Sequence, residues 1–358
     1  MIYSLLSKTG ALGLFVALAF GQVLISRMSI RSKVDSPQVH ASDTGQVLGN
    51  ATGIPLLRKL GMGRPLATAH LRRGIIFAKL GHFREAFDDF DKALHFDPNA
   101  AEVYYNRGRT FGQIGEYRME VEDYSQAIRL YPDYVNAYLN RGVAFDALHE
   151  PDKAILDYDQ TILLDPTYAL AYYNRGLTFM DLKNHEKAIS SFSRAIELDP
   201  GYADAYNNRG IAHHNLKEHK AAIQDYDQAI TLRPKGSLAF YNRGICLGDV
   251  GDYEGAVKDF DEAIRLSPTY KEAFGNRGHA NLHLDRYDQA INDFNTVIEL
   301  DSQDQKAYAG RALAHTRMGR DTEAAKDAEL AIRLGYDAAV LQRQLASAKA
   351  GTPYRQCQ

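Results

Sequence analysis

A pattern of large apolar, small and polar positions recurs every 34 residues along most of this chain. Its clearest mark is the triplet Asn-Arg-Gly, which begins at Asn106, Asn140, Asn174, Asn208, Asn242 and Asn276. With the glycine of this triplet taken as position 8, the pattern divides residues 67–338 into eight units. These units are 67–100, 101–134, 135–168, 169–202, 203–236, 237–270, 271–304 and 305–338.

Five positions of the unit define the elements that the pattern predicts. Position 4 is aromatic, position 8 is glycine and position 20 is alanine in seven of the eight units, and small residues allow two helices to approach closely. Position 24 carries an aromatic ring at Phe90, Tyr124, Tyr158, Phe192, Tyr226, Phe260 and Phe294. Position 32 is Pro98, Pro132, Pro166, Pro200, Pro234 and Pro268. Proline ends a helix because it lacks an amide hydrogen, so each unit is predicted to hold two packed helices, A and B.

This set of positions resembles the tetratricopeptide repeat family, whose repeat length is also 34 residues. The resemblance covers residues 67–338, about three quarters of the chain. It implies an all-α fold, an α-solenoid that forms a right-handed superhelix of eight helix pairs. Terminal units of a solenoid are often atypical, as are His70 and Ser302 here. Residues 339–350 have helical apolar spacing and are expected to form a C-terminal capping helix before a tail at 351–358.

Position 7 is arginine in all eight units, whereas the family usually places leucine there. Position 23 is aspartate in every unit except the fourth, which has Ser191. We therefore predict an Arg–Asp bridge within each unit, with the guanidinium forked onto the carboxylate. The alternative is a ladder of basic residues that binds an anionic ligand.

Positions 2, 5, 6, 9, 12 and 13 share one face of helix A, and the family resemblance implies that this face lines a concave groove. An amide at position 6 can both donate to and accept from a peptide backbone, as in the asparagine ladders of armadillo solenoids. The predicted peptide-binding groove comprises Asn106, Asn140, Asn174, Asn208, Asn242, Asn276, Tyr105, Tyr173 and Tyr241. The alternative is that the asparagines tie adjacent A helices together, or face water, and that the tyrosines pack against neighbouring helices.

The N-terminal residues 1–34 form a different kind of segment. Residues 11–25 are almost wholly apolar, with Lys8 before them and Arg27 after them, a pattern typical of membrane targeting. A cleaved signal and a retained anchor both fit, and we favour the anchor because no small-residue cleavage triplet follows the apolar core directly. Residues 35–66 are rich in glycine and proline and are expected to be a flexible linker.

Composition narrows the possible partners. The net charge of -3 offers no basic surface for nucleic acid. Two cysteines are too few for a disulfide framework, and Cys246 and Cys357 are interpreted as an ordinary buried thiol and a tail residue. His279 and His283 share a face with His213 and His214 two units earlier, but no four ligands converge, so we expect no metal site. No catalytic residues, cofactor or small-molecule substrate are evident.

Two functions remain. The first is a non-enzymatic, membrane-tethered adaptor that binds extended segments of other proteins in its groove. The second is a structural scaffold that docks folded subunits of a membrane or envelope complex through other surfaces. The chain is expected to be membrane-anchored or exported, periplasmic or otherwise extracytoplasmic if bacterial, with its orientation open.

Overall fold

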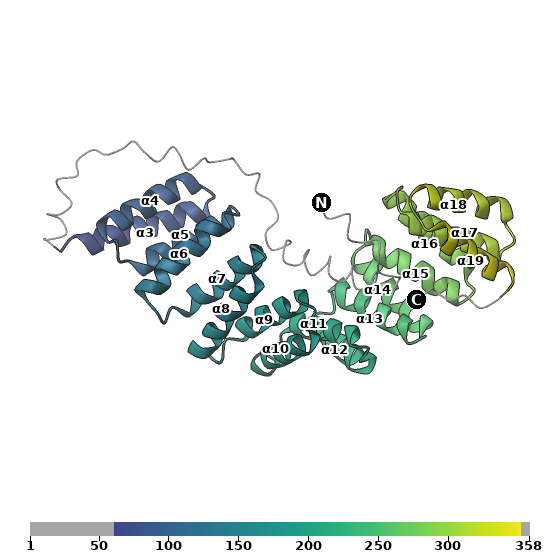
Figure 1. The fold of residues 1–358 in the computed structure, drawn as a ribbon, viewed down its shortest axis with the longest axis horizontal. Helices are drawn as coiled ribbons and strands as arrows, with labels where there is room; N and C mark the ends of the chain where they lie inside the picture. The colour runs from purple at the N-terminus through teal and green to yellow at the C-terminus, as the bar shows by residue number, and fades with distance from the viewer. Residues whose placement is uncertain (1–60, 352–358) are drawn as a thin grey trace. The chain divides into compact units, whose positions relative to one another are not determined.

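The structure, a computed structural model, describes residues 61–351, and within this range the chain forms helices and no strands. The helices fall into two compact parts that divide between Leu198 and Asp199. In each part, consecutive helices pair antiparallel and the pairs stack on one another (Figure 1). The fold is therefore an all-α solenoid of tetratricopeptide-type repeats, as the sequence predicts.

The first part contains the first four units. Its helices are α3 (Gly63–Lys79), α4 (Phe83–Phe96), α5 (Ala101–Gln113), α6 (Tyr117–Leu130), α7 (Val135–Ala147), α8 (Pro151–Leu164), α9 (Ala169–Asp181) and α10 (His185–Leu198).

The second part contains the last four units and one further helix. Its helices are α11 (Ala203–Asn215), α12 (His219–Leu232), α13 (Ser237–Asp249), α14 (Tyr253–Leu266), α15 (Lys271–His283), α16 (Tyr287–Leu300), α17 (Gln305–Arg317), α18 (Asp321–Arg333) and α19 (Ala338–Lys349).

In every unit, the residue at position 15, in the turn between helix A and helix B, has a left-handed backbone conformation. Four units place glycine there, and four place His149, Lys183, Lys217 or Asp285, with φ between 56° and 63°. A side chain in this conformation costs roughly 1–2 kcal/mol, which glycine avoids. The turn geometry is thus imposed by helix packing, whatever residue occupies the position.

The core of each of the first seven units is an aromatic ring inserted against a glycine. A Cβ atom placed on Gly142 would lie 2.7 Å from the Tyr158 ring, and one on Gly176 would lie 2.6 Å from the Phe192 ring. Position 8 is therefore small because it faces the ring at position 24 of its own unit. The alanines at position 20 are fully buried beside this contact in the third to seventh units.

The start of the first helix differs from the expectation. The flexible linker was expected to reach residue 66, but α3 begins at Gly63 and includes Pro65. Proline is compatible with the first helical turn, because the amide hydrogens there have no partner within the helix. The resulting A helix is 17 residues long, against 13 for the A helix of the next unit.

At the other end, α19 covers the last helix pair. Asp337 caps it by accepting a hydrogen bond from the Val340 amide. Leu341 is fully buried against Ala309 and Ala331, which otherwise would face solvent. This is the capping helix that the apolar spacing predicts.

Within residues 61–351, no helix is long and apolar enough to cross a membrane. The apolar segment 11–25, the linker up to residue 60 and the tail from residue 352 lie outside the described residues.

Candidate protein-binding surface

The arginines at position 7 form the predicted bridges within their units. The Arg107 Nε and Nη2 atoms each donate to an oxygen of Asp123 at 2.8 Å. The same two-bond geometry joins Arg73 to Asp89, Arg141 to Asp157, Arg209 to Asp225, Arg243 to Asp259, Arg277 to Asp293 and Arg311 to Asp327. In the fourth unit, Arg175 donates instead to the Ser191 hydroxyl at 3.2 Å.

Six of these guanidiniums also donate to a residue of the preceding unit, which the sequence analysis did not anticipate. The Nη1 atom of Arg107 donates to Asp91 at 2.6 Å, and Asp91 belongs to position 25 of the preceding unit. The equivalent acceptors are Ser125 for Arg141, Asp159 for Arg175, Asp227 for Arg243, Asp261 for Arg277 and Asn295 for Arg311. Position 7 therefore joins helix A to helix B within a unit, and joins that unit to the one before it.

These contacts decide against a basic ladder for an anionic ligand. Burial by itself would lower the pKa of Arg107, but its hydrogen bonds to the Asp123 carboxylate and the charges of Asp123 and Asp91 raise it overall, so the guanidinium stays charged and paired. It also lies over the Tyr104 ring at 5.6 Å. Its side chain is 20% exposed, whereas Arg73, which has no preceding unit, is 55% exposed. We attribute the difference to the missing neighbour.

The asparagines at position 6 point toward the preceding A helix in several units. Asn140 donates to the Tyr105 hydroxyl at 3.0 Å, and Asn276 donates to the Tyr241 hydroxyl at 3.1 Å. Asn242 donates to the Asn207 side chain at 3.0 Å. Position 6 thus bonds to position 5 of the unit before it, which is the linking role that the sequence left as an alternative.

The accessibility of the nine predicted groove residues varies along the array. Asn106, Asn208, Asn242 and Tyr241 are buried, whereas Asn140, Asn174, Asn276, Tyr105 and Tyr173 are half-buried. Asn106 donates to the Glu102 carbonyl of its own helix at 2.8 Å. Only the half-buried set has surface to offer a peptide.

Tyr105 contacts both an aromatic ring and a cation on the A-helix face. Its ring lies 4.8 Å from the Tyr134 ring, and the exposed Arg109 guanidinium lies 5.9 Å from its centroid. Tyr173 packs near Phe192 at 5.8 Å, and the exposed Leu170 lies on the same helix at position 2. These residues give the A-helix face of the first part a mixed aromatic, apolar and amide character.

The histidines that share a predicted face are held by packing. His283 stacks on Tyr253 with ring centroids 3.9 Å apart, and the His279 ring meets Phe294 edge-on at 5.2 Å. Burial lowers the pKa of both histidines to about 4. His214 lies instead beside His219 and Cys246, a grouping that the sequence analysis did not assemble.

A second surface is apolar where the repeat pattern is polar. Leu156 and Leu163 lie on α8, at positions 22 and 29 of the third unit, and their exposed fractions are 67% and 72%. The other units have only charged or polar residues at both positions. Because seven residues make nearly two helical turns, the two leucines share one outward face of α8.

Comparison with known proteins identifies the class. Sequence models of the tetratricopeptide repeat match residues 67–100, 101–134, 169–202, 203–235, 237–270 and 276–339. The chain therefore belongs to the tetratricopeptide repeat family. That family and the fold support a protein–protein interaction module. A comparison with curated proteins found no match.

Solved structures agree on the fold. A tetratricopeptide repeat protein from Parabacteroides merdae ATCC 43184 is 19% identical, with a TM-score of 0.52, covering 70% of this chain and 98% of that one. A chain of the APC/C hetero-tetramer Cut9–Hcn1 has the same identity and TM-score, covering 74% of this chain and 52% of its own. MamA is 28% identical, with a TM-score of 0.43, covering 45% of this chain and 94% of that one. The likeness to the first two structures shows the fold and selects no particular partner.

Proposed function

We propose that this protein is a membrane-tethered adaptor that binds extended segments of other proteins along its A helices. The observation that carries the proposal is the row of half-buried amides at position 6, set beside tyrosines at position 5. The expected tether is the apolar segment 11–25. The family supports a protein partner, while the extended form of that partner is inferred from the side chains themselves.

The amide chemistry suits a peptide backbone. The bond from Asn140 to Tyr105 uses one amide hydrogen, and an asparagine side chain has a second hydrogen and a carbonyl oxygen. Because the first bond fixes the rotamer, a peptide that pairs with the remaining groups loses little additional side-chain entropy. Asn174 and Asn276 have similar accessibility, so they offer the same chemistry.

The surrounding side chains add affinity that does not depend on one peptide sequence. Tyr105 and Tyr173 bury apolar ring area and have few rotatable bonds to restrict. Arg109 and Leu170 are exposed on the same face and supply a charge and an apolar contact. Such a surface recognises the backbone first and the side chains second.

The test measures binding of overlapping unstructured peptides to the purified full-length chain. The variant Asn140→Ala/Asn174→Ala removes two accessible amides and is expected to weaken binding by at least about tenfold, since each lost hydrogen bond contributes roughly 1 kcal/mol. Circular dichroism checks that the helices persist. Unchanged peptide affinity in this folded variant would refute the proposed groove.

The tether has a separate test. Removing residues 1–34 is expected to release the protein from the membrane fraction in cells, and protease protection of the intact chain reports which side of the membrane holds the repeats. Recovery of a shortened chain, lacking its N-terminal segment, in the soluble fraction would exclude a retained anchor and favour a cleaved signal.

The exposed leucines of α8 favour a second candidate, a scaffold that docks a folded subunit. The control variant Leu156→Gln/Leu163→Arg introduces the residue types that other units have at these positions, as at Gln224 and Arg129. The adaptor proposal expects peptide binding to be unaffected. Loss of a folded partner in this variant, with peptide binding retained, would support the scaffold.

A further inference from the structure

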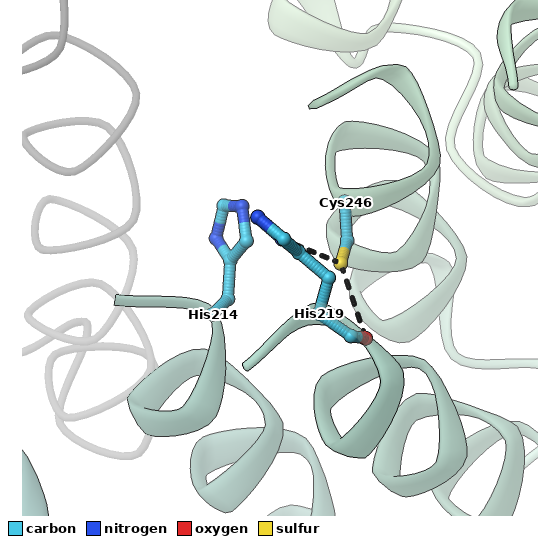
Figure 2. Close-up of side chains that lie close together, drawn as sticks. All are labelled: His214, His219 and Cys246. Atoms are coloured by element: carbon cyan, nitrogen blue, oxygen red, sulfur yellow. Dashed lines mark hydrogen bonds between the residues drawn. The ribbon is translucent and has the colours of Figure 1, made fainter. Parts of the chain in front are cut away.

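Two histidines and a cysteine from three helices of the second part lie close together. One ligand atom from each of His214, His219 and Cys246 lies within 4.8 Å of the other two. His214 lies in the last turn of α11, His219 begins α12, and the buried Cys246 lies within α13 of the next unit. Figure 2 shows the three side chains directed into one space between these helices.

The distances are close to those of a zinc site. The Cys246 sulfur is 3.7 Å from His219 Nδ1. Tetrahedral zinc, with bonds of about 2.0–2.1 Å to nitrogen and 2.3 Å to sulfur, places its ligands about 3.3–3.6 Å apart. No separation in the trio exceeds 4.8 Å, so the ligand atoms have to approach by at most about 1.5 Å, which rotation of the two imidazole side chains can supply.

A carboxylate stands beside the trio. Asp249, three residues after Cys246 and therefore on the same face of α13, has its Oδ2 atom 2.7 Å from His214 Nε2. Figure 2 also shows a ring nitrogen of His219 facing the His214 ring. A ligating imidazole commonly bonds through its other ring nitrogen to a carboxylate, so Asp249 is placed to orient His214 beside the cation.

The repeat pattern shows that this grouping is a departure from the ordinary packing. Position 10, held by Cys246, is alanine in the third, fifth, seventh and eighth units, and position 17, held by His219, is phenylalanine or tyrosine in four units. The positions converge elsewhere too: Thr178 at position 10 donates to Asp146 at position 12 of the unit before, at 2.9 Å. Among the eight units, metal-ligating side chains occupy positions 12 and 17 of one unit and position 10 of the next only here.

We propose that His214, His219 and Cys246 bind a divalent cation of the zinc class, with Asp249 as the carboxylate that orients the His214 ring. Thiolate and imidazole together favour zinc over magnesium or calcium, which prefer oxygen ligands. Burial raises the pKa of the Cys246 thiol to about 12, so the cation displaces the thiol proton, which passes to solvent. The bound cation would join helices of the fifth and sixth units and hold their stacking.

The test uses Co²⁺ as a spectroscopic probe and Zn²⁺ as its competitor, added to the full-length chain after chelation. One equivalent of Co²⁺ is expected to give a thiolate-to-cobalt charge-transfer band with tetrahedral ligand-field bands, and Zn²⁺ should abolish them. The variants Cys246→Ala and His219→Tyr carry residues found at the same positions in other units, so both are expected to fold. Each should lose the charge-transfer band.

Matched controls separate this site from adventitious binding. Cys357→Ala removes the other cysteine, and His82→Gln removes an exposed histidine of the first part, and both should keep the band. Asp249→Asn should weaken affinity by about 10–100-fold. The proposal is overturned if the wild-type chain shows no thiolate band, if Cys246→Ala binds cobalt with the same spectrum, or if the band disappears in Cys357→Ala.

Discussion

The double role of the position-7 arginine can be tested in one unit by removing its two partners separately. Arg243 donates two hydrogen bonds to Asp259, at 2.7 and 2.6 Å, and one to Asp227 of the preceding unit, at 2.5 Å. The Asp259 side chain is almost fully buried, whereas the Asp227 side chain is about half exposed. The variants Asp259→Ala and Asp227→Ala therefore remove partners in different surroundings.

The magnitudes follow from these surroundings. Removing one partner of a fully buried ion pair costs about 3–5 kcal/mol, because the other charge stays buried. Arg243 keeps some access to water, so Asp259→Ala is expected to lower the free energy of unfolding by about 2–3 kcal/mol. Asp227 contributes a surface ion pair, so Asp227→Ala is expected to cost only about 0.2–1 kcal/mol.

A double variant isolates the pair. Arg243→Leu introduces the residue that the family usually has, but it leaves Asp259 buried without its partner, so it should destabilise about as much as Asp259→Ala. Arg243→Leu/Asp259→Ala should cost less than the sum of the single variants by about 2 kcal/mol.

The assay is urea unfolding followed by circular dichroism. Amide hydrogen exchange in α13 and α14 is measured in parallel, because repeat arrays can unfold in segments. Equal costs for Asp259→Ala and Asp227→Ala, or additive costs in the double variant, would refute this account of the bridge.

Three further predictions concern packing, pH and turns. Gly244→Ala should destabilise the chain by about 1–2 kcal/mol, since the new Cβ would lie 2.8 Å from the Phe260 ring. Gly248→Ala in the same helix, where a Cβ would meet no atom within 4 Å, should stabilise the chain by about 0.5–1 kcal/mol. Both free energies are measured by urea unfolding, and equal effects would contradict the steric argument. Burial lowers the pKa of His279 and His283 to about 4, so the unfolded chain binds more protons than the folded chain below pH 6.5. The free energy of unfolding should therefore fall as the pH drops from 6.5 towards 4, by about 1–2 kcal/mol per histidine at pH 5. His283→Gln should reduce this pH dependence, and an unchanged dependence would contradict the assignment to the buried histidines. Lys183→Gly should raise the free energy of unfolding by roughly 0.5–1 kcal/mol, and with it the thermal midpoint, because φ at this residue is 58° and glycine adopts that conformation without strain. A lower midpoint would refute the argument that Lys183 is strained.

The sequence predicted the contacts that lie inside one unit. The glycine at position 8 and the ring at position 24 recur together, as with Gly176 and Phe192, so their contact could be expected from the spacing alone. The arginine at position 7 and the aspartate at position 23 recur in the same way. A contact that repeats with the period of the chain leaves a visible record in the sequence.

Contacts between units were harder to predict, because they depend on how far one helix pair is displaced along the next. The polar residues at position 25, such as Asp91 and Asp227, recur with the repeat and accept from the position-7 arginine of the next unit. Their spacing alone did not show which arginine they would meet. The bond from Asn140 to Tyr105 needed the offset between neighbouring A helices. Predicting the cluster of His214, His219 and Cys246 would have required the relative placement of three helices, which residue spacing along one helix does not give.

The proposed groove is tested most directly by photo-cross-linking in cells. A photoactivatable residue is placed at Arg109 or Leu170 on the A-helix face, and, as the matched set, at Leu156 or Leu163 on α8. The adaptor proposal predicts cross-links to unstructured segments of other proteins from positions 109 and 170, with Asn140→Ala/Asn174→Ala reducing them. Cross-links confined to positions 156 and 163, and unaffected by the asparagine variants, would contradict it.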